Sequence, residues 1–140
     1  MDLLVVAFPA LIAANDGWVQ YVSEAEELSL WTTSAIKKYN GRRVVLYDSN
    51  DHAWEVDRIG PVKPTGFYAK LVGRKIPVSL SLRPVSEAPF QLVREVINEA
   101  IDADDDILTQ SVTANELKAC VRKASSFQTL VDALKTKRAI

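Results

Sequence analysis

The sequence contains one cysteine and one histidine, and this scarcity excludes several kinds of site. With Cys120 alone, neither an intramolecular disulfide nor a cysteine-rich zinc site can form. A Ser-His-Asp or Cys-His arrangement would have to use His52, which lies among turn residues. Cys120 falls on the apolar side of an expected helix, where cysteine behaves as a small inert core residue. We therefore expect no catalytic residue and no enzymatic activity.

The chain also lacks an excess of charge of one sign and a long apolar run. Its formal net charge is −1, whereas nonspecific nucleic-acid binders are strongly basic. The apolar segment 3–14 follows an acidic residue, contains Pro9, and is far shorter than the roughly 20 residues of a membrane span. We interpret this segment as the first buried strand, and we expect a soluble cytoplasmic protein with no membrane partner.

Phosphate-binding and calcium-binding loops are missing as well. Gly66 and Gly73 are isolated, and no G-x-x-x-x-G-K pattern occurs. An EF-hand loop that began at Asp102 would need glycine at its sixth position and glutamate at its twelfth, where the chain has Ile107 and Thr113. We expect no cofactor and no bound metal ion.

What is present is ordinary globular composition, 48% hydrophobic and 25% charged, in 140 residues, close to the size of one domain. Apolar, β-branched or alternating segments predict strands over 5–14, 18–22, 43–47, 53–59, 67–72 and 76–85. A capping pattern at Ser23 predicts a helix over 23–39, and Pro89 with capping patterns at Thr113 and Ser125 predicts a helical tail. This order is typical of a single α+β domain, 1–140, with an antiparallel sheet of about five strands.

The expected core follows from these periodicities. Pro77 should lie on an edge strand, because it cannot donate to a ladder. The residues expected to be buried are Leu28, Trp31, Ile36, Val45, Trp54, Val56, Leu80, Val93, Ile97, Val121 and Leu130.

Acidic residues gather in the helical tail, where residues 86–112 carry seven acidic groups and one basic group, Arg94. Glu95, Glu99 and Asp102 follow one another at intervals of four and three residues, which places them on one face of a helix. The plain interpretation is a solvated helix face. The alternative is a surface complementary to a basic protein. The predicted partner-binding residues are Glu95, Glu99, Asp102, Asp105 and Asp106.

Residues 37–83 show the opposite bias, with ten basic groups against four acidic ones. Within them, aromatic and cationic side chains are combined as in single-strand binders, at Phe67, Tyr68, Lys70, Arg74 and Lys75. The aromatic residues nevertheless alternate as the core residues of a strand would. We therefore do not expect a nucleic-acid partner.

Several short motifs resemble those of small bacterial immunity proteins. They are Asp16-Gly17-Trp18 at the start of a strand, a capped helix, Tyr47-Asp48-Ser49 followed by Trp54-Glu55-Val56, and an acidic run in a helical tail. Immunity proteins are the antidotes encoded beside contact-dependent or polymorphic toxins of bacterial competition. The resemblance implies a cytoplasmic toxin inhibitor that binds its cognate protein toxin and blocks the active site or substrate access. Many such toxins are basic nucleases, for which an acidic helix would mimic the substrate.

Two other functions stay open at the level of sequence. A small enzyme or ligand carrier would need a pocket on the sheet face with convergent polar side chains. A structural or adaptor subunit would form a homodimer through an exposed sheet edge. A toxin gene directly upstream would favour the immunity protein, and a metabolic operon would favour the ligand carrier.

Overall fold

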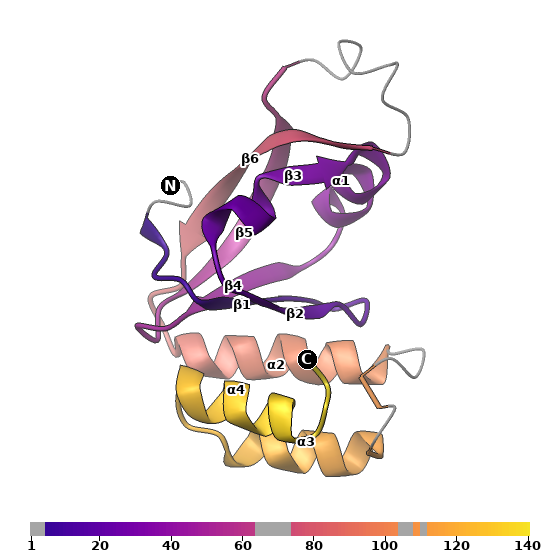
Figure 1. The fold of residues 1–140 in the computed structure, drawn as a ribbon. Coiled ribbons are helices and arrows are strands. Elements are labelled where there is room, and N and C mark those ends of the chain that lie inside the picture. Colours follow the sequence, from indigo (N-terminus) through magenta and orange to yellow (C-terminus); the bar gives the residue numbers. More distant parts are fainter. Residues whose placement is uncertain (1–4, 64–73, 104–107, 110–111) are drawn as a thin grey trace.

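The computed structural model describes residues 5–63, 74–103, 108–109 and 112–140, which form a six-stranded sheet with helices on both of its faces (Figure 1). The strands are β1 (Ala10–Ala14), β2 (Val19–Val22), β3 (Leu30–Thr32), β4 (Val44–Asp48), β5 (Ala53–Pro61) and β6 (Lys75–Pro84). The helices are the 3-10 turn η2 (Ala25–Leu28), α1 (Thr33–Asn40), α2 (Pro89–Asp102), α3 (Ala114–Lys123) and α4 (Phe127–Thr136).

The strand order is β2-β1-β4-β5-β6-β3, and every bonded pair is antiparallel. The predicted α+β class and both predicted hairpins, β1–β2 and β4–β5, are confirmed. The sheet has six strands where about five were expected.

The sheet carries an apolar core on each face, because β1 and β4 are buried on both sides. Leu11 and Val45 point toward the helices of the tail, whereas the next residues, Ile12 and Leu46, point into the second core. Figure 1 shows α2, α3 and α4 as a layer beneath β1, β2 and β4, while β5, β6 and β3 curl away toward α1. A strand with two buried faces requires an unbroken apolar run, which residues 10–14 supply.

The predicted core residues are all buried except Val56, which is partly exposed. Directly after Val56 lies a bulge in β5, where the pairing with β6 shifts between Val56 and Arg58. An extra residue in one strand reverses the side to which the following side chains point. Ile59 therefore packs in the same core as Trp54, although simple alternation had placed the two on opposite faces.

The helix predicted over 23–39 is wrong in its first half. That half contains η2 and the short strand β3, which pairs with β6, so α1 begins only after Thr32. The Thr32 hydroxyl accepts a hydrogen bond from the Ala35 backbone N–H at 3.1 Å, and the cap therefore lies at Thr32 and not at Ser23. The spacing of Leu28 and Trp31 fits a helix equally well, but β6 offers an open edge to the β-branched and aromatic segment. Tertiary pairing overrides the local pattern here.

The prediction that Pro77 lies on an edge strand is also wrong, because β6 is paired with both β5 and β3. The Pro77 carbonyl oxygen accepts a hydrogen bond from the Val62 backbone N–H at 3.0 Å, just beyond the last residue of β5. Proline has no backbone N–H, and the nitrogen of Pro77 faces the end of β5. The ladder therefore loses only one hydrogen bond. The rest of β6 alternates as predicted, with Leu80 buried and Ser81 exposed.

The helical tail follows the sequence signals closely. Pro89 occupies the first turn of α2, and the Thr113 hydroxyl caps α3 as predicted. The cap of α4 is Ser126 and not Ser125, since the Ser126 hydroxyl accepts from the Thr129 backbone N–H. The strand predicted over 67–72 lies outside the described residues.

Candidate functional site

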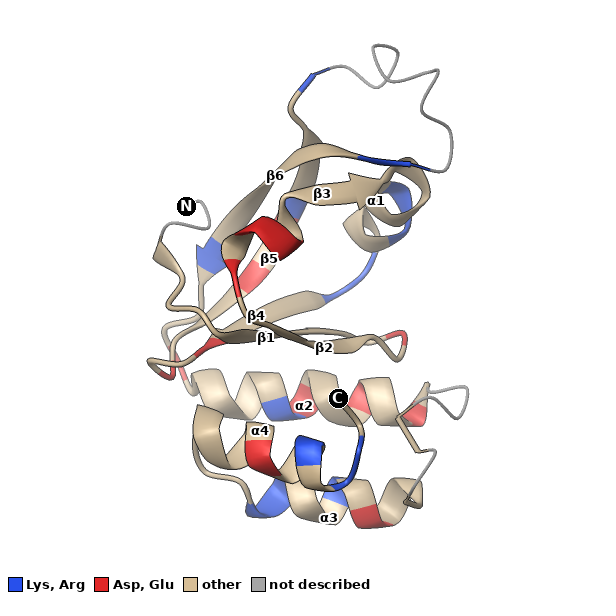
Figure 2. Ribbon diagram, in the orientation of Figure 1, with Lys and Arg blue, Asp and Glu red and all other residues tan. Residues whose placement is uncertain are grey.

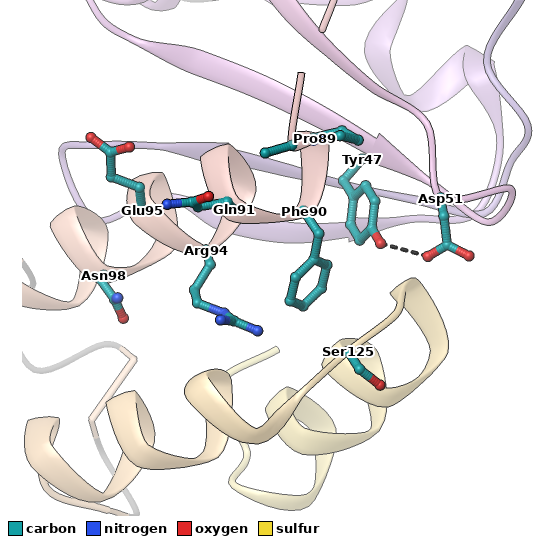
Figure 3. Close-up of a pocket in the computed structure, with 10 residues that line it drawn as sticks. Tyr47, Asp51, Pro89, Phe90, Gln91, Arg94, Glu95, Asn98 and Ser125 are labelled. Atoms are coloured by element: carbon teal, nitrogen blue, oxygen red, sulfur yellow. Dashed lines mark hydrogen bonds between the residues drawn. The ribbon is translucent and has the colours of Figure 1, made fainter. Parts of the chain in front are cut away.

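An open cleft lies where the first turns of α2 meet the β4–β5 turn and the loop between α3 and α4 (Figure 3). Its volume is about 740 Å³. Aromatic, charged and amide side chains line it together: Tyr47, Asp51, Phe90, Gln91, Arg94, Glu95, Asn98 and Ser125. A concave surface toward which several polar groups converge is the usual form of a binding site. We therefore take this cleft as the candidate functional site.

The Asp51 carboxylate fixes one wall of the cleft. Its Oδ1 accepts hydrogen bonds from the Tyr47 hydroxyl at 2.5 Å and from the Phe127 backbone N–H at 2.7 Å. Phe127 is the first residue of α4, so a single carboxylate oxygen joins the β4–β5 turn to a helix N-terminus, where negative charge is favoured. Burial, together with the hydrogen bond to Asp51 and its charge, raises the pKa of the Tyr47 hydroxyl well above its usual range. The phenol thus remains a hydrogen-bond donor at neutral pH.

Arg94 presents a guanidinium group that is held from two sides. Its Nη2 donates to the Ala124 carbonyl oxygen at 2.6 Å, and its Cζ lies 4.7 Å from the centroid of the Phe90 ring. Within the described part of the chain Arg94 forms no ion pair, and its buried Nε has no acceptor. A guanidinium keeps its charge in such surroundings and binds planar anions well.

The acidic groups of the cleft are, by contrast, already bonded to donors. Asp51 accepts the two hydrogen bonds described above, and Glu95 Oε1 lies 3.3 Å from Arg43 Nη1. One turn beyond Arg94, the buried Oδ1 of Asn98 has no donor among the described residues. Arg94 is thus a cation of the cleft that has no carboxylate partner among the described residues.

Two lining residues other than glycine have a left-handed backbone. The φ angle is 61° at Asp51 and 43° at Ala88, the residue that precedes α2. Aspartate tolerates this region through local hydrogen bonds, whereas alanine gains nothing that offsets a strain of roughly 1 kcal/mol or more. Strain of this kind tends to gather at functional sites, and here it lies in the lining of one cleft.

Three of the acidic residues predicted to bind a partner are described. Glu95, Glu99 and Asp102 belong to α2, and their side chains are 57%, 40% and 64% exposed. Figure 2 shows acidic positions in red along this helix. Glu95 lines the cleft, and the other two continue away from it along the helix. The predicted Asp105 and Asp106 lie outside the described residues.

Basic side chains of the same chain already contact these acids. Arg43, just before β4, places Nη1 3.3 Å from Glu95 Oε1 and 3.4 Å from Glu99 Oε1. Lys118 of α3 forms an ion pair with Asp102. The described part of the predicted acidic face is thus partly neutralised by basic side chains of the same chain, although the side chains of Glu95, Glu99 and Asp102 remain exposed.

The two residues considered for nucleophilic chemistry lie in different parts of the fold. His52 is exposed in the β4–β5 turn, with its ring centroid 5.9 Å from that of Trp54. Cys120 lies in α3 and is partly exposed, so the expectation of a core position is only partly met. Its neighbours Leu117 and Val121 take the buried positions of that helix.

Smaller hollows lie elsewhere in the described part of the chain. A groove of about 180 Å³ separates β2 from β3 and is lined by Trp18, Trp31 and Tyr39, whose rings pack on one another at centroid distances of 4.8 to 5.9 Å. An apolar hollow of about 360 Å³ lies beside Trp54. Of the aromatic and basic residues considered for nucleic acid, Phe67, Tyr68 and Lys70 lie outside the described residues.

The cleft itself was not predicted from the sequence. The one available signal was Arg94, the single base within an otherwise acidic stretch. The sequence did not indicate that Tyr47 and Asp51 meet α2 and α4, because that contact depends on how the helical layer packs on the sheet.

Known protein families, curated proteins and solved structures were compared with the chain, and none matches it. In the described part of the chain, each helix is too short or too polar to cross a membrane. Among the same residues, no three histidine, cysteine or acidic side chains gather as metal ligands would. Function is therefore inferred from the geometry and charges of the cleft.

Proposed function

We propose that the protein is a non-enzymatic immunity protein that binds a cognate bacterial toxin and blocks its active site or substrate access. The observation that carries this proposal is the open cleft beside the exposed face of α2, with Arg94, Phe90 and Tyr47 in its lining. Arginine and aromatic residues contribute most to binding at protein interfaces. An open cleft accommodates a protruding segment of another protein, whereas small ligands are usually enclosed almost completely.

The exposed acids of α2 supply the rim of the proposed interface. Glu95, Glu99 and Asp102 form a row that begins at the cleft and continues along the helix. A basic toxin surface would compete with Arg43 and Lys118 for these carboxylates. Exposed rim charges act mainly on the association rate and its salt dependence. The proposed interface thus has two parts, a cleft that provides affinity and an acidic row that orients the partner.

The class of partner comes from the resemblance to immunity proteins. One of the motifs that carry it, Tyr47-Asp48-Ser49, includes a residue of the cleft, Tyr47. The turn that follows this motif supplies Asp51, which joins the sheet to α4. The same segment therefore carries the resemblance and shapes the proposed binding surface.

The test is to identify the gene directly upstream of this chain and to express its product, the candidate toxin, in cells with and without the chain. We expect the chain to restore growth and to form a stable complex with the toxin. Reversal of two rim charges, Glu99→Lys with Asp102→Lys, should slow association by about tenfold at low salt and less at high salt. The matched control is Glu26→Lys, an exposed reversal on η2 across the sheet. Absence of both protection and complex formation would contradict the proposal.

A second candidate, a small-ligand carrier, is favoured by the convergence of Gln91, Arg94 and Asn98 on one cleft. It predicts micromolar affinity for a free small molecule, measured as a rise in melting temperature across a panel of organic acids and amides. Such affinity, without protection against any neighbouring toxin, would replace the first proposal by the second.

A further inference from the structure

We propose that the cleft binds a carboxylate group of the partner protein, one oxygen of which accepts a charge-assisted hydrogen bond from Arg94. This inference rests on the proposed function, since it names the chemical group of the toxin that enters the cleft. It also changes the expected charge pattern, because the toxin would present an acidic group here beside the basic surface that faces the row of acids.

The guanidinium of Arg94 is preorganised for such a ligand. Nη2 is engaged by the Ala124 carbonyl oxygen, and the Phe90 ring supports the group 4.7 Å from Cζ. Nε is buried, whereas Nη1 is neither buried nor bonded to any described residue, which leaves it as the donor open to the cleft. A donor that is already held in place loses little conformational entropy when a ligand binds.

The electrostatic state of Arg94 also favours an anion. Arg94 is partly buried, and no described carboxylate pairs with it. A partly desolvated charge without a counter-ion is unfavourable, and a carboxylate from a partner would remove that penalty. Figure 3 shows the guanidinium extending from α2 into the space between the Phe90 ring and the Ser125 loop.

The surroundings select a carboxylate over a phosphate. Asp51 and Glu95 both line the cleft, so a doubly charged phosphate would meet two negative groups. A carboxylate has one charge and is planar, and it can lie in the plane of the guanidinium above Phe90. The exposed Ser125 also lines the cleft, in the loop that faces Arg94.

The carboxylate has two sources in a protein, an acidic side chain or the chain terminus, and peptides separate them. The full chain, labelled with ¹⁵N, is titrated with an amidated hexapeptide that contains one central glutamate. A second peptide has glutamine there and a free carboxyl terminus, and a third has glutamine and an amidated terminus. Inorganic phosphate is the fourth probe. We expect saturable shifts of the Gln91, Arg94 and Ser125 amide signals with the first or the second peptide, and none with the third.

The matched variants are Arg94→Gln and Arg42→Gln. Arg42 is an exposed arginine at the opposite end of β4 from the cleft. Loss of one hydrogen bond between charged groups should weaken binding of the carboxylate peptide by at least about tenfold in Arg94→Gln and leave it unchanged in Arg42→Gln. If Arg94→Gln does not fold, the position of the shifts in the unmodified chain decides the matter.

Absence of shifts in the cleft with both carboxylate peptides would overturn the inference, as would equal shifts with the third peptide. Tighter binding of phosphate than of either peptide would overturn the choice of ligand. None of these results bears on whether the chain protects against a toxin. Conversely, cleft shifts without protection in cells would contradict the proposed function and leave the carboxylate site intact.

Discussion

Replacement of Asp51 by alanine should remove the hydrogen bonds that connect the sheet to α4 and so destabilise the fold. Asp51 Oδ1 accepts from the Tyr47 hydroxyl at 2.5 Å and from the Phe127 backbone N–H at 2.7 Å, and both donor residues are almost fully buried. A hydrogen bond to a charged acceptor contributes roughly 1.5–3 kcal/mol. Because Asp51 itself is exposed, water can reach part of the vacated space. We therefore expect Asp51→Ala to lower the free energy of unfolding by about 3 kcal/mol, toward the lower limit for two such bonds.

Urea denaturation followed by tryptophan fluorescence measures this change as a lower midpoint at an unchanged slope. Tyr47→Phe removes one of the two donors and should lower the free energy of unfolding by about 1.5 kcal/mol. In the double variant the two effects should not add, since both substitutions break the same hydrogen bond, and a coupling energy of about 1.5 kcal/mol is expected. If Asp51→Ala lowers the free energy of unfolding by less than about 0.5 kcal/mol, or if the effects of the two substitutions add in the double variant, the carboxylate does not connect the sheet to α4 as proposed.

Three further changes test other parts of the fold. Burial alone would raise the pKa of Asp16, but hydrogen bonds from Lys38 and from the backbone lower it below the ordinary value. The stability that this carboxylate contributes is therefore present above the ordinary pKa and is lost as the pH falls. Asp16→Asn should flatten the dependence of the urea midpoint on pH below about 4. Ala88→Gly should raise the free energy of unfolding by about 0.5–1 kcal/mol, because glycine accepts a φ of 43° without strain, and an unchanged or lower melting temperature would argue against strain there. Ile97→Ala should lower the free energy of unfolding by about 3 kcal/mol in urea, since Ile97 is fully buried between α2 and the sheet, whereas a loss under 1 kcal/mol would contradict that packing.

The sequence predicted those elements whose periodicity has a single interpretation. Ile76 to Leu82 alternate so regularly that only a strand fits, and Pro89 with the apolar face of the next residues permits only a helix. The segment around Leu28 and Trp31 has a spacing that suits a helix, yet it forms a turn and a strand. This segment becomes a strand and not a helix because it pairs with the edge of β6. The local sequence carries no information about that distant strand.

The same limit applies to the candidate site. The acidic face of α2 could be predicted because Glu95 and Glu99 are one turn apart on a single helix. Their ion pairs with Arg43 could not, since that residue lies more than fifty positions earlier in the chain. The cleft combines a hairpin turn, the start of a helix and an interhelical loop, and only the packing of α2 and α4 on the sheet brings these three together.

The most direct test of the proposed interface is amide hydrogen exchange of the chain, free and in complex with the candidate toxin, the product of the gene directly upstream. Binding through the cleft and the exposed face of α2 predicts slower exchange in residues 88–99 and 124–127 when the toxin is bound, with rates elsewhere unchanged. Slower exchange confined to the sheet edges β2 and β3, with the cleft unaffected, would contradict the account.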